Sequence, residues 1–246
     1  MYLPTINAII ERRILLNFVV EKEVMNDYLP KPFTPRLYKN KAIVGICLIR
    51  LKHIRPYGFP KLIGFGSENA AHRIAVEWRQ NGKLNQGVYI PRRDSSSLLN
   101  AFAGGRFFPG IHHYANFSTL ENENIYDIKL DGADGTKVSV QARETMSWNP
   151  NSIFETLKSA SDFFEVGSLG YSPTGQIGKF DGIELRTFNW KVSQLEVLEV
   201  HSSFFEDTSI FPKGSVKFDH GLLMKNIEHE WKSIPKLKEE SYEASA

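Results

Sequence analysis

The run GGRFFPGIHHYANF, from Gly104 to Phe117, is the stretch of this chain that decides its fold. Two further runs lead up to it: GFGSENAAHRIAVEW, from Gly64 to Trp78, and GVYIPRRDSSSLLNAF, from Gly87 to Phe102. The segment Ala71–Trp78 of the first of these runs has the branched and aromatic residues that are typical of strands. So does His113–Leu120, which begins in the run Gly104–Phe117 and continues past it. The sequence therefore predicts strands on both sides of the middle run.

A short helix is predicted between those two strands. Asp94 and the serines after it match the residue types that cap a helix N-terminus, and Leu98, Leu99 and Phe102 would then face inward. Gly104-Gly105 would end the helix, because glycine readily adopts the backbone conformation that follows a helix C-terminus. Asp94 is a capping residue in this interpretation and takes no part in a reaction.

Strand patterns dominate the rest of the chain. They predict strands at Arg13–Val20, Ala42–Leu51, Asn124–Leu130, Lys137–Thr145, Ser168–Tyr171, Gly182–Asn189 and Leu195–His201. Helices are predicted at Glu21–Tyr28 and from Ser152 to Gly167, because Ser152 and Glu155 have the spacing of a capping box. Many short strands with few helices predict a single mostly β domain over residues 1–234, closed into a barrel or a strongly curled sheet. The charged residues 235–246 are predicted to form a flexible tail.

Composition and charge exclude several classes of protein. A hydrophobic content of 41% and a charged content of 24% are typical of a soluble globular protein. A formal net charge of +2 gives no electrostatic case for nucleic-acid binding, which needs clustered lysine and arginine. The sequence shows no signal peptide and no run near the ~18 apolar residues of a membrane span. We therefore expect a soluble cytoplasmic protein with no nucleic-acid and no membrane partner.

The sequence gives only weak signals for a metal site. The single cysteine, Cys47, excludes an intramolecular disulfide and a zinc site of several cysteines, and its apolar surroundings predict a buried structural thiol. Glu68 and His72 have the spacing of a metal-binding pair on a helix, but they lie in a strand-like segment and lack a third ligand. An ion pair of Glu68 with Arg73, or with an arginine of another strand, is the simpler interpretation. No metal is predicted.

Most of the chain, from about Glu11 to Trp231, resembles the YqjF-like family of uncharacterised proteins, a branch of the acetoacetate-decarboxylase-like superfamily. The three quoted runs carry this resemblance. It implies a mostly β (α+β) fold, namely a cone-shaped, largely antiparallel β-barrel with a few peripheral helices and a ligand pocket inside. The resemblance to acetoacetate decarboxylase itself is confined to three short segments.

The segment that carries the catalytic lysine in acetoacetate decarboxylases is different here. In those enzymes a Gly-Arg pair is followed, a few residues on, by Pro-Lys-Lys, whose first lysine forms the Schiff base. Gly105-Arg106 is followed at that distance by Ile111-His112-His113, which contains no lysine. Because histidine cannot form the iminium that acts as an electron sink, the resemblance implies chemistry without a Schiff-base lysine, and no cofactor is predicted. The alternative is that Lys137, Lys179 or Lys217 enters the pocket from another strand.

The resemblance also implies a set of site residues. Glu68 falls where the superfamily has its active-site glutamate, and Arg12 or Arg13 falls where it has an active-site arginine. The catalytic candidates are Glu68 and His113, and the substrate-binding candidates are Arg12, Arg13, Arg106 and His72. The Arg92-Arg93 pair is a further candidate for holding a carboxylate by bidentate hydrogen bonds.

His112 and His113 are adjacent, so on a strand they would point to opposite faces. At most one of them would enter the pocket, and the alignment favours His113. There it could act as a general acid or base near neutral pH. The alternative is that it forms a hydrogen bond in a half-polar cavity and has no catalytic role.

Three functions fit these features. The first is an internal pocket for a small organic acid or carbonyl compound, with lysine-independent acid/base turnover of the lyase or isomerase type. The second is a non-enzymatic barrel that binds or senses a small ligand, and the third is a structural or partner-binding protein with a vestigial cavity. The missing lysine does not separate the first two. The predicted partner is a small molecule, and the sequence leaves its identity open, as it does a homo-oligomer.

Overall fold

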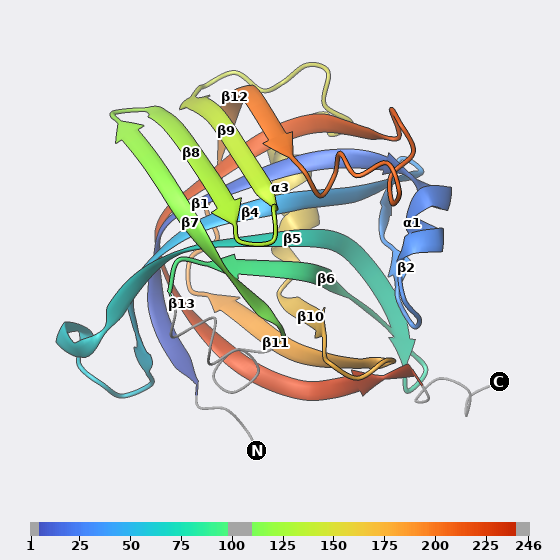
Figure 1. The fold of residues 1–246 in the computed structure, drawn as a ribbon, viewed down its shortest axis with the longest axis horizontal. Helices are drawn as coiled ribbons and strands as arrows, with labels where there is room; N and C mark the ends of the chain where they lie inside the picture. The colour runs from blue at the N-terminus through green and yellow to red at the C-terminus, as the bar shows by residue number, and fades with distance from the viewer. Residues whose placement is uncertain (1–4, 98–109, 240–246) are drawn as a thin grey trace.

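The computed structural model describes residues 5–97 and 110–239 (Figure 1). Its strands belong to one sheet and are, in chain order, β1 (Ile6–Glu21), β2 (Thr34–Pro35), β3 (Leu37–Tyr38), β4 (Lys41–Pro56), β5 (Phe65–Gln80), β6 (Lys83–Ser95), β7 (His112–Asn122), β8 (Ile125–Gly132), β9 (Lys137–Glu144), β10 (Leu169–Pro173), β11 (Lys179–Thr187), β12 (Ser193–Ser202) and β13 (Val216–Lys238). The helical segments of the described chain are α1 (Lys22–Tyr28), the 3₁₀ helix η1 (Lys61–Ile63) and α3 (Leu157–Glu165). No helix among these is long and apolar enough to cross a membrane.

The sheet is built around five long strands in the order β13-β1-β4-β5-β6, which we call the shared sheet. Each of its two outermost strands divides its outer edge between two partners. Strand β6 pairs with β10 at Val88–Tyr89 and with β7 at Arg93–Ser95. Strand β13 pairs with β12 at Gly221–Leu223 and with β11 at His229–Lys238. Two branches, β7-β8-β9-β12 and β10-β11, therefore each close the shared sheet on itself.

The branch β7-β8-β9-β12 covers one face of the shared sheet, which we call the packed face (Figure 1). Alternation along β1 and β4 places Ile14, Leu16 and Ile46 on this face, where all three are fully buried. Ile128 of β8 and Val140 of β9 pack in the same cluster. Burial of a side chain of this size stabilises the fold by roughly 1.5–3 kcal/mol. The packed face thus forms the main hydrophobic core.

The other face of the shared sheet, which we call the cavity face, is covered by α3 and by the branch β10-β11. Leu15, Cys47 and Ala75 point to this side and pack with Phe163 and Phe164 of α3. In Figure 1 the helix α3 lies behind the sheet, on the side away from β7, β8 and β9. These apolar residues fill part of the space between the sheet and its cover, and the rest is a cavity.

The predicted fold class is confirmed. The sheet is largely antiparallel, with parallel pairing of β6 to β7 and to β10, and the helices lie at its periphery. The predicted helix Glu21–Tyr28 is α1, and the apolar run Ala42–Leu51 forms part of β4, which is buried on both faces as far as Leu48. The predicted hairpin through residues 131–135 joins β8 to β9.

The start of α3 differs from the prediction. The helix begins at Leu157, because Thr156 and Ser159 form the capping box in place of Ser152 and Glu155. Ser152 Oγ instead donates a hydrogen bond to the carboxylate of Asp219 at 2.6 Å. A side chain from a distant strand therefore overrides a local sequence signal.

Two further segments differ from the prediction. Asp94 lies in β6 and accepts hydrogen bonds from Arg92 Nε, so it is a strand residue and does not cap a helix. Residues 98–109, which include most of the predicted helix, lie outside the described residues. The residues 235–238, predicted to begin a flexible tail, are the end of β13 and pair with β11. Leu237 is 1% exposed, so the end of this strand is held by burial as well as by the ladder.

Candidate functional site

A cavity of about 360 Å³ lies on the cavity face, between the shared sheet, α3 and the branch β10-β11. Its wall combines cationic and aromatic side chains, among them Arg13, Arg36, Arg73, Arg93, Trp190 and Trp231. A volume of this size fits a small organic molecule. We call it the main cavity.

Strand register brings a thiol and two guanidinium groups together in this wall. Cys47 of β4 pairs with Leu15 of β1 and with Ala71 of β5, so Arg13 and Arg73, two residues further along those strands, share its face. Arg73 Nε donates to Cys47 Sγ at 3.1 Å, and Arg13 Nη2 donates to it at 3.5 Å. Burial alone would raise the pKa of the Cys47 thiol, but the charges and hydrogen bonds of the two arginines outweigh burial and lower it below its usual value.

Arg73 is oriented by a chain of buried polar groups beneath the cavity. Its Nη2 donates to Asn17 Oδ1, and Asn17 Nδ2 donates to His220 Nε2 at 2.9 Å. The proton of the His220 ring is therefore on Nδ1, which donates to Asp219 Oδ2 at 2.6 Å. Burial lowers the pKa of His220 in spite of the nearby Asp219 carboxylate, so the ring stays neutral. Arg73 is thus held by a neutral acceptor.

Arg93 and Arg36 make few contacts with other polar side chains. Arg93 Nε donates to Ser172 Oγ at 3.0 Å, while its Nη2 is buried and has no hydrogen-bond partner. Burial lowers the pKa of Arg93 to about 10. Arg36 donates to the carbonyl oxygen of Phe163 at 2.9 Å, and its guanidinium carbon lies 4.1 Å from the centre of that ring. Burial lowers the pKa of Arg36 as well.

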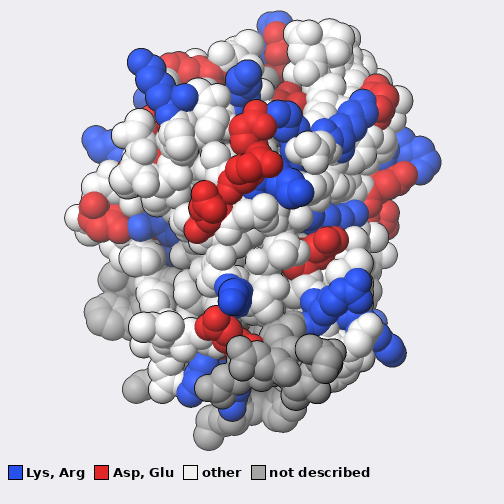
Figure 2. Space-filling model, turned by 90° about the vertical axis from the view of Figure 1, so that its right-hand side faces the viewer, with Lys and Arg blue, Asp and Glu red and all other residues white. Residues whose placement is uncertain are grey.

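The charge of the main cavity is unbalanced. Five arginines of the described residues line its wall, and one of them, Arg186, pairs with Glu230 at 4.0 Å. Within residues 5–97 and 110–239, no ion pair joins the other four, at positions 13, 36, 73 and 93, to a carboxylate. Glu165 and Glu184 belong to the wall, but no ion pair links either of them to these arginines. On the outer surface shown in Figure 2, by contrast, lysine and arginine are interspersed with aspartate and glutamate. The excess positive charge is in an enclosed site, where electrostatic interactions are strong.

A second cavity, of about 60 Å³, shares Arg93 and Trp231 with the wall of the main cavity. Its other lining residues include Asn69, Asp94 and His112. The parallel register of β6 with β7 sets this arrangement, because it places His112 opposite Arg93. Of the two adjacent histidines, His112 thus lies in the wall of the second cavity.

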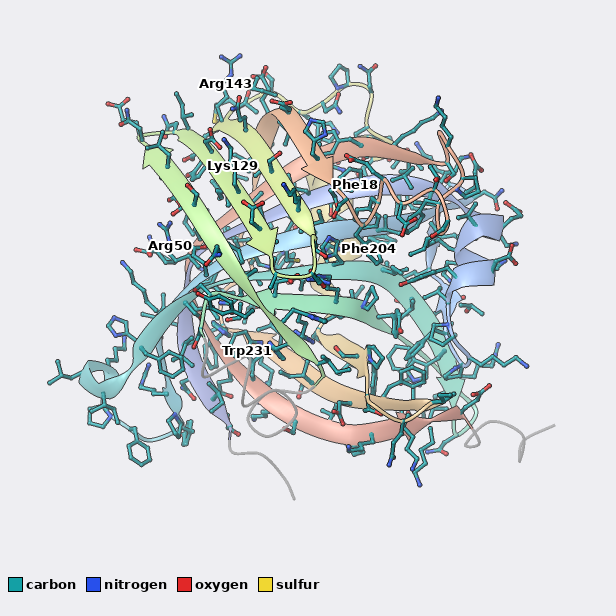
Figure 3. All side chains as sticks on the ribbon, in the orientation of Figure 1. Phe18, Arg50, Lys129, Arg143, Phe204 and Trp231 are labelled. Carbon is teal, nitrogen blue, oxygen red and sulfur yellow. The ribbon has the colours of Figure 1, made fainter. Side chains whose placement is uncertain are left out.

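The predicted residues Glu68 and Arg12 lie on the packed face, away from both cavities. Arg12 Nη2 donates to Glu68 Oε2 at 2.5 Å, and Arg12 Nη1 donates to Glu121 Oε1 at 2.6 Å. Arg50 donates to Glu68 as well and pairs with Glu121 at 2.8 Å. In Figure 3 the labelled Arg50 of this cluster lies well apart from Trp231 of the cavity wall. This cluster has balanced charge, and it matches the ion-pair interpretation of Glu68.

The predicted residues His72 and His113 also lie outside the cavity walls. His72 is fully buried on the packed face, with its Nε2 3.2 Å from Ser202 Oγ and its ring packed on Phe204. Burial and, secondarily, the charge of Arg92 lower the pKa of His72 to about 3. The His113 side chain is 42% exposed, because it alternates with His112 along β7. Arg106 lies outside the described residues.

Of the described site residues predicted from sequence, Arg13 is in the wall of the main cavity, and the Arg92-Arg93 pair contributes Arg93. Arg73, Cys47 and the supporting His220 were not predicted to have these roles. The position of Arg73 could have been predicted, because adjacent residues on a strand point to opposite faces and Arg73 follows His72. No local signal points to His220, because its partner Asn17 is distant in sequence.

The fold is similar to that of several solved enzymes. An acetoacetate decarboxylase from Legionella pneumophila matches with a TM-score of 0.61 and 10% identity, over 96% of this chain and 89% of that one. An acetoacetate decarboxylase-like enzyme from Sphingomonas wittichii RW1 matches with 0.56 and 8%, over 95% and 91%. The enduracididine biosynthesis enzyme MppR, solved with pyruvate, matches with 0.56 and 8%, over 97% and 91%. The molecule is therefore a protein of the acetoacetate-decarboxylase-like fold.

The sequence defines the family more narrowly. Residues 8–216 match the model of DUF2071, described as "Uncharacterized conserved protein (COG2071)", and the chain belongs to that family. No curated protein matches the chain in sequence. The resemblance to the YqjF-like family is thus confirmed, and the solved structures confirm the fold that this resemblance implied. Any functional residues have to be argued from the cavity.

Proposed function

We propose that the main cavity binds a small organic acid through its arginines. The observation that carries this proposal is the group of enclosed guanidinium ions without a carboxylate partner. A buried charge without a counter-charge is unfavourable, and an anionic ligand would supply that counter-charge. A guanidinium group also matches a carboxylate by two parallel hydrogen bonds, which gives specificity for this kind of anion.

The rest of the wall suits a ligand with a small apolar or carbonyl-bearing body. Ile10, Ile49, Trp190 and Trp231 supply apolar surface beside the arginines. MppR, which has a similar fold, was solved with pyruvate. This supports a 2-oxo acid as the class of ligand for the present chain.

The proposed chemistry does not use a Schiff-base lysine. The described walls of the two cavities contain no lysine, and the side chain of Lys137 is 75% exposed. The titratable groups that could transfer a proton include Cys47 in the wall of the main cavity and His112 in the wall of the second cavity, which shares Arg93 and Trp231 with the main one. We therefore propose acid/base turnover of the lyase or isomerase type at these two residues, in place of Glu68 and His113. A binding or sensing barrel without turnover is the alternative.

Ligand binding is tested by calorimetry with pyruvate, acetoacetate and other small carboxylates. We expect binding to the wild type and to Arg143→Gln, a matched control whose arginine is exposed and pairs with Glu196. Arg93→Gln should weaken binding by about tenfold or more, because a charge-assisted hydrogen bond is worth roughly 1.5–3 kcal/mol. Equal binding by Arg93→Gln and the wild type would contradict the proposed site.

Turnover is tested separately from binding. Borohydride should leave no adduct on any lysine after incubation with pyruvate, as read by intact mass, and a stable lysine adduct would contradict lysine-independent chemistry. Exchange of the pyruvate methyl protons in heavy water should be faster with the wild type than with His112→Gln or Cys47→Ser. Binding without any exchange would favour the non-enzymatic alternative.

A further inference from the structure

We propose that Cys47 is a thiolate nucleophile that adds to the carbonyl carbon of a 2-oxo acid bound in the main cavity. The ligand part of this proposal rests on the proposed function, whereas the thiolate part does not. The first supporting observation is geometric: two guanidinium groups, from Arg13 and Arg73, direct N–H donors at the same sulfur atom from neighbouring strands.

A neutral thiol explains this geometry poorly. The sulfur of an S–H group is a weak hydrogen-bond acceptor, and two cations beside it favour loss of its proton. Neither arginine has a carboxylate partner among the described residues, so the sulfur is the nearest group that can balance their charge. The charge of Cys47 also acts on Arg93, whose pKa it raises against the larger effect of burial. Two cavity arginines therefore contact one potential anion, and Arg93 lies in the same cavity wall.

A second and independent observation points to a ligand beside this sulfur. Arg13 Nε and Arg93 Nη2 are both buried, and neither has a hydrogen-bond partner. Buried N–H groups in native proteins nearly always find an acceptor, so these two donors call for acceptor atoms inside the cavity. A carboxylate held by them would lie in the cavity whose wall also contains Cys47.

The proposed step is balanced without any oxidant or reductant. A lone pair of Cys47 Sγ forms the C–S bond, the π bond of the carbonyl breaks, and its electron pair moves to the oxygen. The resulting alkoxide takes one proton from solvent, which gives a hemithioketal. Loss of that proton and of the C–S bond reverses the step. Hydrogen bonds from the arginines would stabilise the alkoxide as it forms.

The thiolate is tested first, without a ligand. Because Cys47 is the single cysteine of the chain, the ultraviolet absorbance of a thiolate can be titrated against pH with Cys47→Ser as the blank. We expect the thiolate to form at a lower pH than in an unperturbed cysteine, and Arg13→Gln and Arg73→Gln should each move its formation to higher pH. A titration like that of a free thiol would overturn the proposal. Two arginine variants are used so that the test survives if one of them fails to fold.

The nucleophile is tested next by alkylation, read as a mass shift on the full chain. Iodoacetate carries a carboxylate and iodoacetamide does not, so a thiolate beside carboxylate-binding arginines should react with iodoacetate about tenfold faster. Pyruvate should protect Cys47, and in carbon NMR labelled pyruvate should give a tetrahedral carbon signal, distinct from that of free pyruvate hydrate, with the wild type but not with Cys47→Ser.

The outcomes separate the two proposals. If pyruvate binds but gives no tetrahedral carbon signal, the nucleophile is overturned and the acid-binding cavity stands. If both reagents alkylate Cys47 equally and pyruvate neither binds nor protects, the acid-binding function fails, and with it the covalent step. Protection together with the sulfur-dependent carbon signal supports both.

Discussion

Two arginine doublets, Arg12-Arg13 and Arg92-Arg93, are divided in the same way between the two faces of the shared sheet. The first member of each lies on the packed face in ion pairs: Arg12 with Glu68 and Glu121, and Arg92 with Asp94 and Asp134. The second member lies on the cavity face, where neither has a carboxylate partner among the described residues. The residue type and the strand are the same in each pair, and only the face differs.

We interpret the arginines of the packed face as structural and those of the cavity face as candidates for ligand binding. On the packed face, the arginine charges are balanced by carboxylates of the protein, so Arg12 holds β7 and Arg92 holds the turn between β8 and β9 against the shared sheet. On the cavity face, the charges of Arg13 and Arg93 have no carboxylate partner among the described residues, so another kind of group has to balance them. We therefore expect variants on the packed face to change the free energy of unfolding, and variants on the cavity face to change ligand binding.

The largest effect is expected for Glu68→Gln. This change leaves Arg12, whose side chain is 3% exposed, and Arg50 with Glu121 as their remaining carboxylate. Breaking a buried ion pair in this way should lower the free energy of unfolding by about 3 kcal/mol, as measured by urea denaturation. Calorimetry should show unchanged binding of pyruvate.

The matched control is Glu196→Gln, which removes the carboxylate of an exposed pair with Arg143. We expect no measurable loss of stability, because an exposed pair is largely compensated by solvent. If Glu68→Gln abolished pyruvate binding while the protein stayed folded, Glu68 would belong to the site and the division between the two faces would be wrong.

The second expected effect is a pH dependence of the free energy of unfolding, caused by His72 on the packed face. Its pKa in the folded state is about 3, below the ordinary value near 6.5, because burial disfavours the charged ring. Between these two values the unfolded chain binds more protons, so stability is complete above pH 6.5 and falls as the pH decreases toward 3. His72→Phe should reduce this acid-induced loss by up to about 1.4 kcal/mol per pH unit, as measured by urea denaturation at several pH values.

An exposed histidine with the opposite shift serves as a control. Hydrogen bonds to Glu199 and Glu206 raise the pKa of His201, so the stability it contributes is present at acid pH and is lost as the pH rises through its folded pKa. His201→Gln should therefore act in the opposite direction to His72→Phe. His201→Gln is compared with the wild type above pH 6.5, where its raised pKa places the titration. If His72→Phe kept the wild-type loss of stability between pH 3 and 6.5, some other group would be responsible for the acid sensitivity.

Much of the fold could be predicted from the sequence, because strand alternation and turn residues are local. The apolar run in β4, the helix α1 and the β8–β9 hairpin are examples. The start of α3 could not be predicted in the same way, since the side chain that would have capped it early bonds to Asp219 of β13. Local signals are reliable only where no distant partner competes for the same polar group.

The site was less predictable, because face and register depend on irregularities that the sequence does not show. A register shift between Ile10 and Arg12 helps decide which arginine of the first doublet faces the cavity. The parallel pairing of β6 with β7 selects His112 over His113. The sequence correctly indicated that the two histidines would point in opposite directions, but the choice between them needed the neighbouring strand.

The smallest change in the free energy of unfolding is expected for variants of the Arg92-Arg93 doublet, which also give the most direct comparison of the two faces. Arg93→Met removes an enclosed charge that has no carboxylate partner, so the protein without ligand should gain about 1 kcal/mol in the free energy of unfolding. Arg92→Met should instead lose stability, because it leaves the buried Asp94 carboxylate without its nearest cation. Pyruvate should raise the melting temperature of Arg92→Met but no longer that of Arg93→Met. If both substitutions were destabilising and both left binding intact, neighbouring arginines would share one structural role, and the cavity would need another explanation for its charge.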